Sequence, residues 1–359
     1  MTVRNLPFWV SAWLFISGII CTIDALFVIL RPHTLPGGKW NHIVQAYNLY
    51  LQVDLRYSDL KDTFVKGISL MNLVEVFINY IVLAIQISGK PGLSVLLAFM
   101  VSTMTFSKTV LYFLVSTSLC NGEHFVNHSD WRKTVFLYFI PNGIWILVPF
   151  ICMVATGSIL VHSMESGQQS KKKKKSQQLK FIMAGRILPF WVAVWLFISS
   201  IIVTIDALFV LLRPHSLPDG KWNFLFEPYN IYIHVDKRYA DLNDTFNYGQ
   251  SFMNLAEMCL NIIALIMYNK GKVGLSVLVA FMVSTMTFSK TVFYFLVSSE
   301  LCGGQHFVNH NEWKSAVFLY IIPNGIWIVV PFLSMVATGK IIVDCTGNGQ
   351  TSGKKTKSN

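Results

Sequence analysis

The chain contains one sequence twice, and this internal repeat limits its possible folds more than any other feature. Residues 1–177 align without a gap over residues 183–359, and residues 92–116 recur as residues 274–298 with two substitutions. Doubling of a whole reading frame, in the genome or in a gene model, produces such a pattern. Each copy should therefore fold by its own hydrophobic pattern, with half of the chain as the structural unit.

The composition indicates a membrane protein. Hydrophobic residues make up 53% of the chain and charged residues only 13%, which is more apolar surface than a soluble domain of this length can bury. Four apolar stretches in each copy are long enough to cross about 30 Å of hydrocarbon. They cover residues 8–30, 67–86, 93–115 and 134–157, then 190–212, 249–268, 275–297 and 316–339. We predict an all-α, polytopic membrane protein with eight spans, because a membrane barrel would show segments of about ten residues with alternating polarity.

The basic residues predict the domain organisation and the orientation. We expect a first four-span domain at residues 1–162, a basic cytosolic linker at 163–187, a second four-span domain at 188–345 and a basic cytosolic tail at 346–359. Lysines and arginines concentrate in the linker and tail, which should lie on the cytosolic side. Since four is an even number of spans, both copies enter the membrane in the same direction and form parallel repeats. They act either independently or as an internal pseudo-dimer.

Two signals suggest the endoplasmic reticulum membrane, with both termini cytosolic. Sequons at Asn127 and Asn243 fall in loops assigned to the luminal side. Lys355 and Lys357 have the spacing of a dilysine retrieval signal. A solvated basic tail beside anionic lipid would carry the same residues.

The distribution of charge and the cysteine positions argue against a nucleic-acid-binding protein and against a disulfide-rich or metal-binding protein. The charge of +11 is concentrated in the linker and tail, where it faces an anionic leaflet, so we expect the lipid bilayer and not a nucleic acid as its partner. Only Cys120 and Cys302 correspond between the copies. We therefore expect no disulfide framework, no structural metal and no cofactor.

The ionisable residues inside the spans are the best candidates for function. Such groups are costly in hydrocarbon and mark functional sites by default. Copy one has Asp24, Glu75 and Lys108, and copy two has Asp206, Glu257 and Lys290 at the matching positions. Counted at about 1.5 Å per residue, they lie at one depth in the luminal leaflet. Two carboxylates could share one lysine there.

Helical spacing extends these positions into polar stripes that should meet inside each bundle. The predicted ligand-binding residues are Asn72, Lys108, Tyr112, Asn142 and Trp145, with Asn254, Lys290, Tyr294, Asn324 and Trp327 in the second copy. Apolar residues around them leave room for an apolar body with a polar or cationic head. Polar groups also act as interhelical contacts that fix packing. However, two carboxylates with one cation leave a charge that a structural role does not need.

Three elements of each copy resemble the emopamil-binding protein family, whose EXPERA domain is shared with the sigma-2 receptor. The order and spacing of these elements across four spans carry the resemblance, which covers nearly all of both copies. In copy one they are Ile23-Asp24-Ala25-Leu26, Asp54-Leu55-Arg56-Tyr57 leading to Asp62-Thr63-Phe64, and Val110-Leu111-Tyr112 with Asn142-Gly143-Ile144-Trp145.

Catalytic members of this family are sterol isomerases that move a ring double bond from the 8 to the 7 position. This chemistry needs an acid that protonates the alkene and a base that removes a neighbouring proton. By this resemblance, the catalytic residues would be Asp24 and Glu75, with Asp206 and Glu257 in copy two. Trp145 would face the carbocation, and Asn142 would hold a hydroxyl or a water.

Other features of the sequence are more similar to the non-catalytic members of the family. The isomerases carry a histidine one turn before the first acid, where this chain has Ile20 and Ile202. The pair Asp24 and Glu75 is more similar to the acidic pair of the sigma-2 receptor, which implies binding of sterols or lipophilic amines. A transporter is a third hypothesis, because Pro141 and Pro149 could break the fourth span around a site. It is the weakest of the three, since the ionisable residues lie in one leaflet.

Overall fold

The computed structural model describes residues 5–172, 188–311 and 313–347, and this part of the chain has eight helices long and apolar enough to span a membrane. In the first repeat these are α1 (Phe8–Ile29), α3 (Thr63–Ile87), α4 (Pro91–Leu114) and a fourth span of α5 (Trp131–Lys133), the π-helical turn η5 (Thr134–Phe139) and α6 (Ile140–Lys172). In the second they are α8 (Phe190–Leu211), α10 (Thr245–Asn269), α11 (Val273–Val297) and α12 (Trp313–Ser315), η11 (Ala316–Ile321) and α13 (Ile322–Gly347). The predicted all-α, polytopic fold is confirmed.

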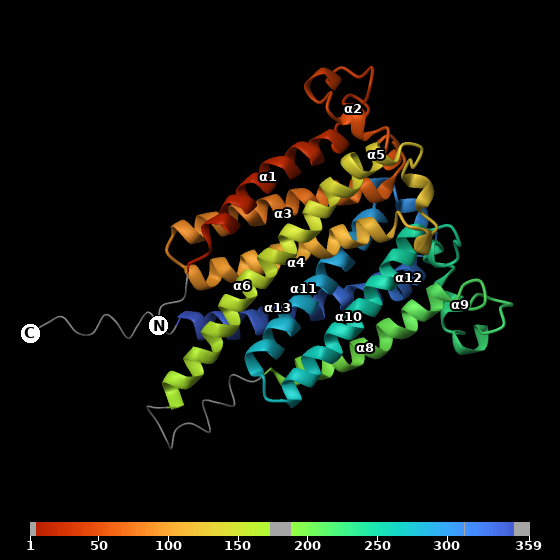
Figure 1. Cartoon of the computed structure of the whole chain (residues 1–359). Coiled ribbons are helices and arrows are strands. Elements are labelled where there is room, and N and C mark those ends of the chain that lie inside the picture. Colours follow the sequence, from red (N-terminus) through yellow and green to blue (C-terminus); the bar gives the residue numbers. More distant parts are fainter. Residues whose placement is uncertain (1–4, 173–187, 312, 348–359) are drawn as a thin grey trace, which may run out of the picture.

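Short helices in the connections complete the fold. They are η1 (Asn41–Ile43), α2 (Tyr47–Tyr50), η2 (Leu55–Tyr57), η3 (Ser118–Cys120) and η4 (Glu123–Phe125), then η7 (Asn223–Leu225), α9 (Tyr229–Tyr232), η8 (Lys237–Tyr239), η9 (Glu300–Cys302) and η10 (Gln305–Phe307). The connections that carry α2, α5, α9 and α12 gather at one end of the molecule (Figure 1). The two repeats therefore run in the same direction, as predicted.

Some helix ends differ from the hydropathy prediction. The second span begins at Thr63, before residue 67, because the Asp62 carboxylate caps the helix by accepting from Val65 N at 2.8 Å. Lys66 in this first turn lowers the local hydropathy. Helix α6 continues through Lys172, past residue 162 where we ended the first domain. Residues 173–187 and 348–359, which include the predicted dilysine signal, lie outside the described residues.

Each repeat is a layered bundle. In the first repeat α1 packs on α3, α3 on α4, and α4 on α6, and the second repeats this order with α8, α10, α11 and α13. The repeats meet mainly through α4 and α11, with further contacts from α3, α6 and α13 (Figure 1).

Glycines allow the closest approach between the repeats. A Cβ added to Gly67 on α3 would lie 2.6 Å from Val297 Cγ2 and 2.7 Å from the Phe293 ring. Gly249 on α10 meets Val115 in the same way, at 2.6 Å. Small residues at such crossings let membrane helices pack closely, so this interface is built from equivalent positions of both copies.

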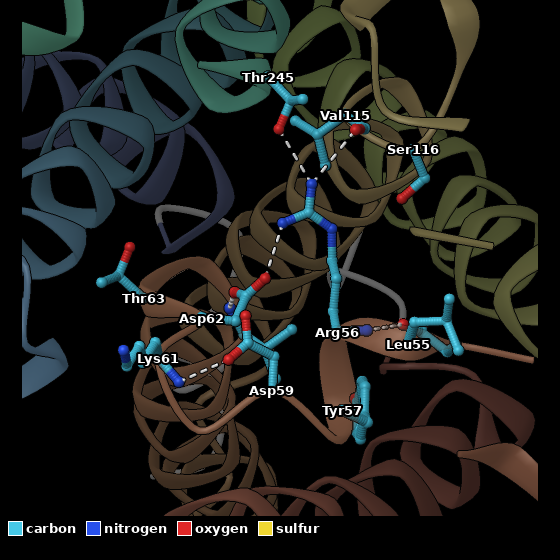
Figure 2. A network of polar contacts seen from close by, with 12 residues as sticks. Leu55, Arg56, Tyr57, Asp59, Lys61, Asp62, Thr63, Val115, Ser116 and Thr245 are labelled. Atoms are coloured by element: carbon cyan, nitrogen blue, oxygen red, sulfur yellow. Dashed lines mark hydrogen bonds and ion pairs between the residues drawn. The ribbon is translucent and has the colours of Figure 1, made fainter. Parts of the chain in front are cut away.

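The buried Arg56, in the loop between α1 and α3, forms hydrogen bonds with residues of both repeats. The Arg56 guanidinium donates to Asp62 Oδ2 at 2.9 Å, to the Val115 carbonyl at 3.3 Å and to Thr245 Oγ1 of the second repeat at 3.0 Å (Figure 2). Arg56 is only 4% exposed and also lies over the Phe125 ring. Charge-assisted hydrogen bonds of this kind are strong. The Asp-x-Arg-Tyr segment thus has a structural role, which Arg238 repeats with Asp244.

Candidate ligand-binding site

Each repeat encloses a cavity among its four spans and the loop helix at one end. The volumes are about 300 Å³ in the first repeat and about 310 Å³ in the second. The predicted residues that line the first cavity are Asp24, Asn72, Lys108, Tyr112, Asn142 and Trp145, and those that line the second are Asp206, Asn254, Glu257, Lys290, Tyr294, Asn324 and Trp327. The polar stripes of the sequence therefore converge on one space in each copy.

Glu75 is the exception among the predicted residues. It does not line the first cavity, and instead borders a smaller cavity of about 10 Å³ with Asn79 and Ser102. Lys108 Nζ lies 2.8 Å from Glu75 Oε2, which also accepts from Thr105 Oγ1 at 2.9 Å. Sequence reasoning placed Glu75 beside Asp24 in a shared site, and in the first repeat the structure separates them.

Asp24 is the acidic group that faces the first cavity. Its carboxylate accepts hydrogen bonds from the hydroxyls of Tyr57 at 3.0 Å and Tyr47 at 3.3 Å, and from Asn72 Nδ2 at 3.1 Å. Asp206 has the matching partners Tyr239, Tyr229 and Asn254. None of the ion pairs in the described part of the chain includes either aspartate.

The lysine connects the two carboxylates indirectly. Lys108 Nζ donates to Asn72 Oδ1 as well as to Glu75, while the Asn72 amide donates to Asp24. In the second repeat Lys290 lies 3.0 Å from Glu257 Oε1 and donates to Asn254. The expectation that two carboxylates share one lysine is therefore corrected: the lysine pairs with the glutamate, and an asparagine carries the contact to the aspartate.

A third carboxyl lies beside each cavity in the loop. Asp54 accepts hydrogen bonds from the hydroxyls of Tyr50 and Tyr112 and from the backbone N–H of Arg56. Burial raises the pKa of Asp54 to about 6, although these tyrosines and Arg56 oppose the shift. Burial likewise raises the pKa of Asp236 to about 6. The Tyr112 hydroxyl, which we predicted to contact ligand, is thus held by the loop.

The fourth span supplies the wall opposite Asp24. Asn142 lines the cavity, and its Nδ2 donates to the Tyr138 carbonyl at 2.9 Å. The Trp145 ring lies 5.1 Å from the Trp13 ring of α1, a contact between the first and fourth spans. Trp327 and Trp195 form the same contact at 5.0 Å in the second repeat.

The tyrosines of the loop helix were missed by the sequence reasoning. Tyr47, Tyr50 and Tyr57 all line the first cavity, and all three lie outside the predicted spans, to which the search for polar groups was confined. A usable signal was present, because Tyr47, Asn48 and Tyr50 recur as Tyr229, Asn230 and Tyr232, whereas the five residues directly before them, 42–46, all differ from residues 224–228.

These features define a class: a multi-pass membrane protein in which each of two four-helix repeats has a main cavity with an aspartate in its lining. Comparison of the chain with protein-family models, with curated proteins and with solved structures gives no match. The resemblance to the emopamil-binding protein family stays a prediction that rests on the residues quoted above.

Proposed function

We propose that each repeat binds an amphiphile, with a hydroxyl or protonated amine of its head on Asp24 or Asp206 and its apolar body in the cavity. One observation carries this proposal: each aspartate lies in a cavity and is held only by neutral donors. A cation or a hydroxyl from a ligand is the partner that such a carboxylate lacks. Sterols and lipophilic amines have this chemistry, and the family resemblance implies the same ligands.

The lining of the cavities favours binding over catalysis. Ile20 and Ile202 line the two cavities at the positions where sterol isomerases carry a histidine. In the first repeat Glu75 is paired with Lys108 and lies outside the main cavity, so it is not placed to act as a base on a ligand held by Asp24. General acid–base catalysis needs both groups within hydrogen-bond reach of the substrate.

The surroundings of Ile20 support entry of the ligand from the bilayer. This residue lines the first cavity and is 44% exposed. Pro141 and Asn142 of α6 line the same cavity. An amphiphile dissolved in the membrane would reach Asp24 between α1 and α6 without crossing water.

Equilibrium binding to the purified full-length chain tests this function. Radiolabelled cholesterol and a radiolabelled lipophilic amine are titrated into the protein in lipid nanodiscs. We expect saturable binding of at least one of them, and competition between the two if they share a site. If excess unlabelled ligand displaced neither radiolabelled ligand, the signal would reflect only partition into lipid, and the proposal would be overturned.

Sterol 8,7-isomerisation is the second candidate, and the second repeat carries the observation that favours it. Asp206 and Glu257 line the same cavity there, so an acid and a base face one space. Expression in cells that lack the isomerase, with sterols measured by mass spectrometry, separates the candidates. The binding proposal predicts continued accumulation of the 8-ene sterol. Formation of the 7-ene product, lost in Asp206→Asn, would make the protein an enzyme.

We further propose that the protein resides in the endoplasmic reticulum membrane with both termini cytosolic. The loop that contains Asn243 would then be luminal, and Asn243 is exposed. We expect a glycan there, seen as a mobility shift that a glycosidase removes and that Asn243→Gln abolishes. A shift that survives in Asn243→Gln and disappears in Asn127→Gln would move the glycan to the first repeat. If a membrane-impermeant thiol reagent labelled Asn243→Cys from the cytosolic side, this loop would be cytosolic and the proposed orientation would be wrong.

A further inference from the structure

The second span presents different side chains to the two cavities. Asn247 and Glu257 line only the second cavity, and their counterparts Val65 and Glu75 do not line the first. Ile68 lines the first cavity, and Gln250 occupies the equivalent position in the second. The surrounding head-group residues are the same in both copies, because Asp206, Asn254 and Lys290 repeat Asp24, Asn72 and Lys108. A carboxamide thus replaces a hydrocarbon side chain beside the same aspartate, asparagine and lysine.

Gln250 is buried but has no hydrogen-bond partner. Gln250 is only 6% exposed, and neither its Nε2 nor its Oε1 has a hydrogen-bond partner among the described residues. Native proteins pair nearly all buried polar groups, because an unpaired one costs free energy. The neighbouring polar side chains on α10 are engaged: Asn247 donates to the Arg238 carbonyl and Asn254 to Asp206.

The free amide lies close to the predicted head-group site. Residues four apart share one helix face, so Gln250 is one turn from Asn254, whose Nδ2 lies 2.8 Å from Asp206 Oδ2. A primary amide offers two donors and one acceptor. A hydroxyl both donates and accepts, and so matches both sides of the amide.

We infer that the second cavity selects an amphiphile with an additional hydroxyl beside the head group that Asp206 holds, and that Gln250 recognises this hydroxyl. The first cavity, with Ile68 at this position, accepts the same head group without the added hydroxyl. The protein is therefore a two-site binder with different ligand preferences. This inference rests on the proposed binding function and adds the ligand class of the second site.

Two matched amines test the inference. Octadecylamine and sphinganine share a saturated eighteen-carbon chain and an amine, and sphinganine adds two hydroxyls next to the amine. Binding is measured in nanodiscs in the Asp24→Asn background, which leaves the second site. We expect sphinganine to bind about tenfold more tightly than octadecylamine, and Gln250→Ile to abolish this preference while octadecylamine still binds.

The first repeat provides the reciprocal control. In the Asp206→Asn background, which leaves the first site, the two amines should bind equally, and Ile68→Gln should create a preference for sphinganine. Gln250→Met serves as a second apolar variant if Gln250→Ile folds poorly. An unchanged preference in the Gln250 variants overturns the inference and leaves the binding function intact. Failure of both amines to bind saturably at either site overturns the binding function for amines, and the inference with it.

Discussion

Lys108 Nζ and Glu75 Oε2 lie 2.8 Å apart in the interior of the first repeat, and Lys290 and Glu257 form the same pair at 3.0 Å in the second. Of the two carboxylates inside the spans of each repeat, the aspartate of the first span is therefore the one without an ion pair among the described residues. The lysine, which the sequence suggested two carboxylates could share, thus holds one of them and leaves the other available to a ligand.

Removal of the lysine should destabilise the bundle. Glu75 is 2% exposed, so Lys108→Met leaves a buried carboxylate without its ion-pair partner. We expect a loss of about 3–5 kcal/mol in the free energy of unfolding. Thermal unfolding of the purified protein in detergent measures this loss, and the exposed Lys61→Met is the matched control.

The double variant Lys108→Met/Glu75→Met separates an ion pair from simple packing. Replacement of both partners by apolar side chains of similar size is often nearly neutral, so the double variant should recover most of the lost stability. If it were as unstable as Lys108→Met alone, the ion pair would not be the source of the effect.

Substitution of Gly67 should weaken the contact between the repeats. The added methyl of Gly67→Ala would meet Val297 and Phe293 below 3 Å, and one of these side chains must move. We expect a loss of about 1–3 kcal/mol. Gly143→Ala is the control, because nothing lies within 4 Å of its Cβ position and alanine is the better helix former. Thermal unfolding compares the two variants, and equal transition temperatures would contradict a close approach at Gly67.

The loop carboxyls should make stability depend on pH. Burial raises the pKa of Asp54 from 3.8 to about 6, while Tyr50, Tyr112 and Arg56 face its carboxyl and Asp62 lies nearby. Between these values the folded state binds more protons than the unfolded state, so the free energy of unfolding rises as the pH falls.

From pH 7 to pH 5 this contribution is about 1 kcal/mol for each carboxyl, Asp54 and Asp236. Comparison of thermal unfolding of the wild type with Asp54→Asn/Asp236→Asn at both pH values isolates it from other titrations. The wild type should gain stability relative to the variant at pH 5. A constant difference between the two proteins would contradict the raised pKa.

The sequence predicted the fold well because hydropathy and repetition are properties of whole segments. The eight spans and their common direction follow from apolar length and an even number of crossings. The cavity was predicted in part, since Asp24, Asn72 and Lys108 recur at helical spacing on spans that had to pack together. Counting residues along each helix predicted that these three side chains lie at the same depth in the membrane.

Contacts made by loops and by side-chain rotation were beyond this reasoning. The Tyr47 and Tyr57 hydroxyls reach Asp24 only because the loop folds back over the end of the bundle. Depth alone could not show that Glu75 lies outside the first cavity while Glu257 lines the second. The difference between Ile68 and Gln250 was visible in the sequence, but it acquired meaning only when both were found to line the cavities.

Counting the ligands bound to each chain tests the central claim most directly. Native mass spectrometry of the protein with a saturating lipophilic amine should show two ligands for the wild type, one each for Asp24→Asn and Asp206→Asn, and none for the double variant. Asp59→Asn, an exposed loop substitution, should retain two. Two specifically bound ligands in the double variant would contradict the account, because the aspartates would then not hold the head groups.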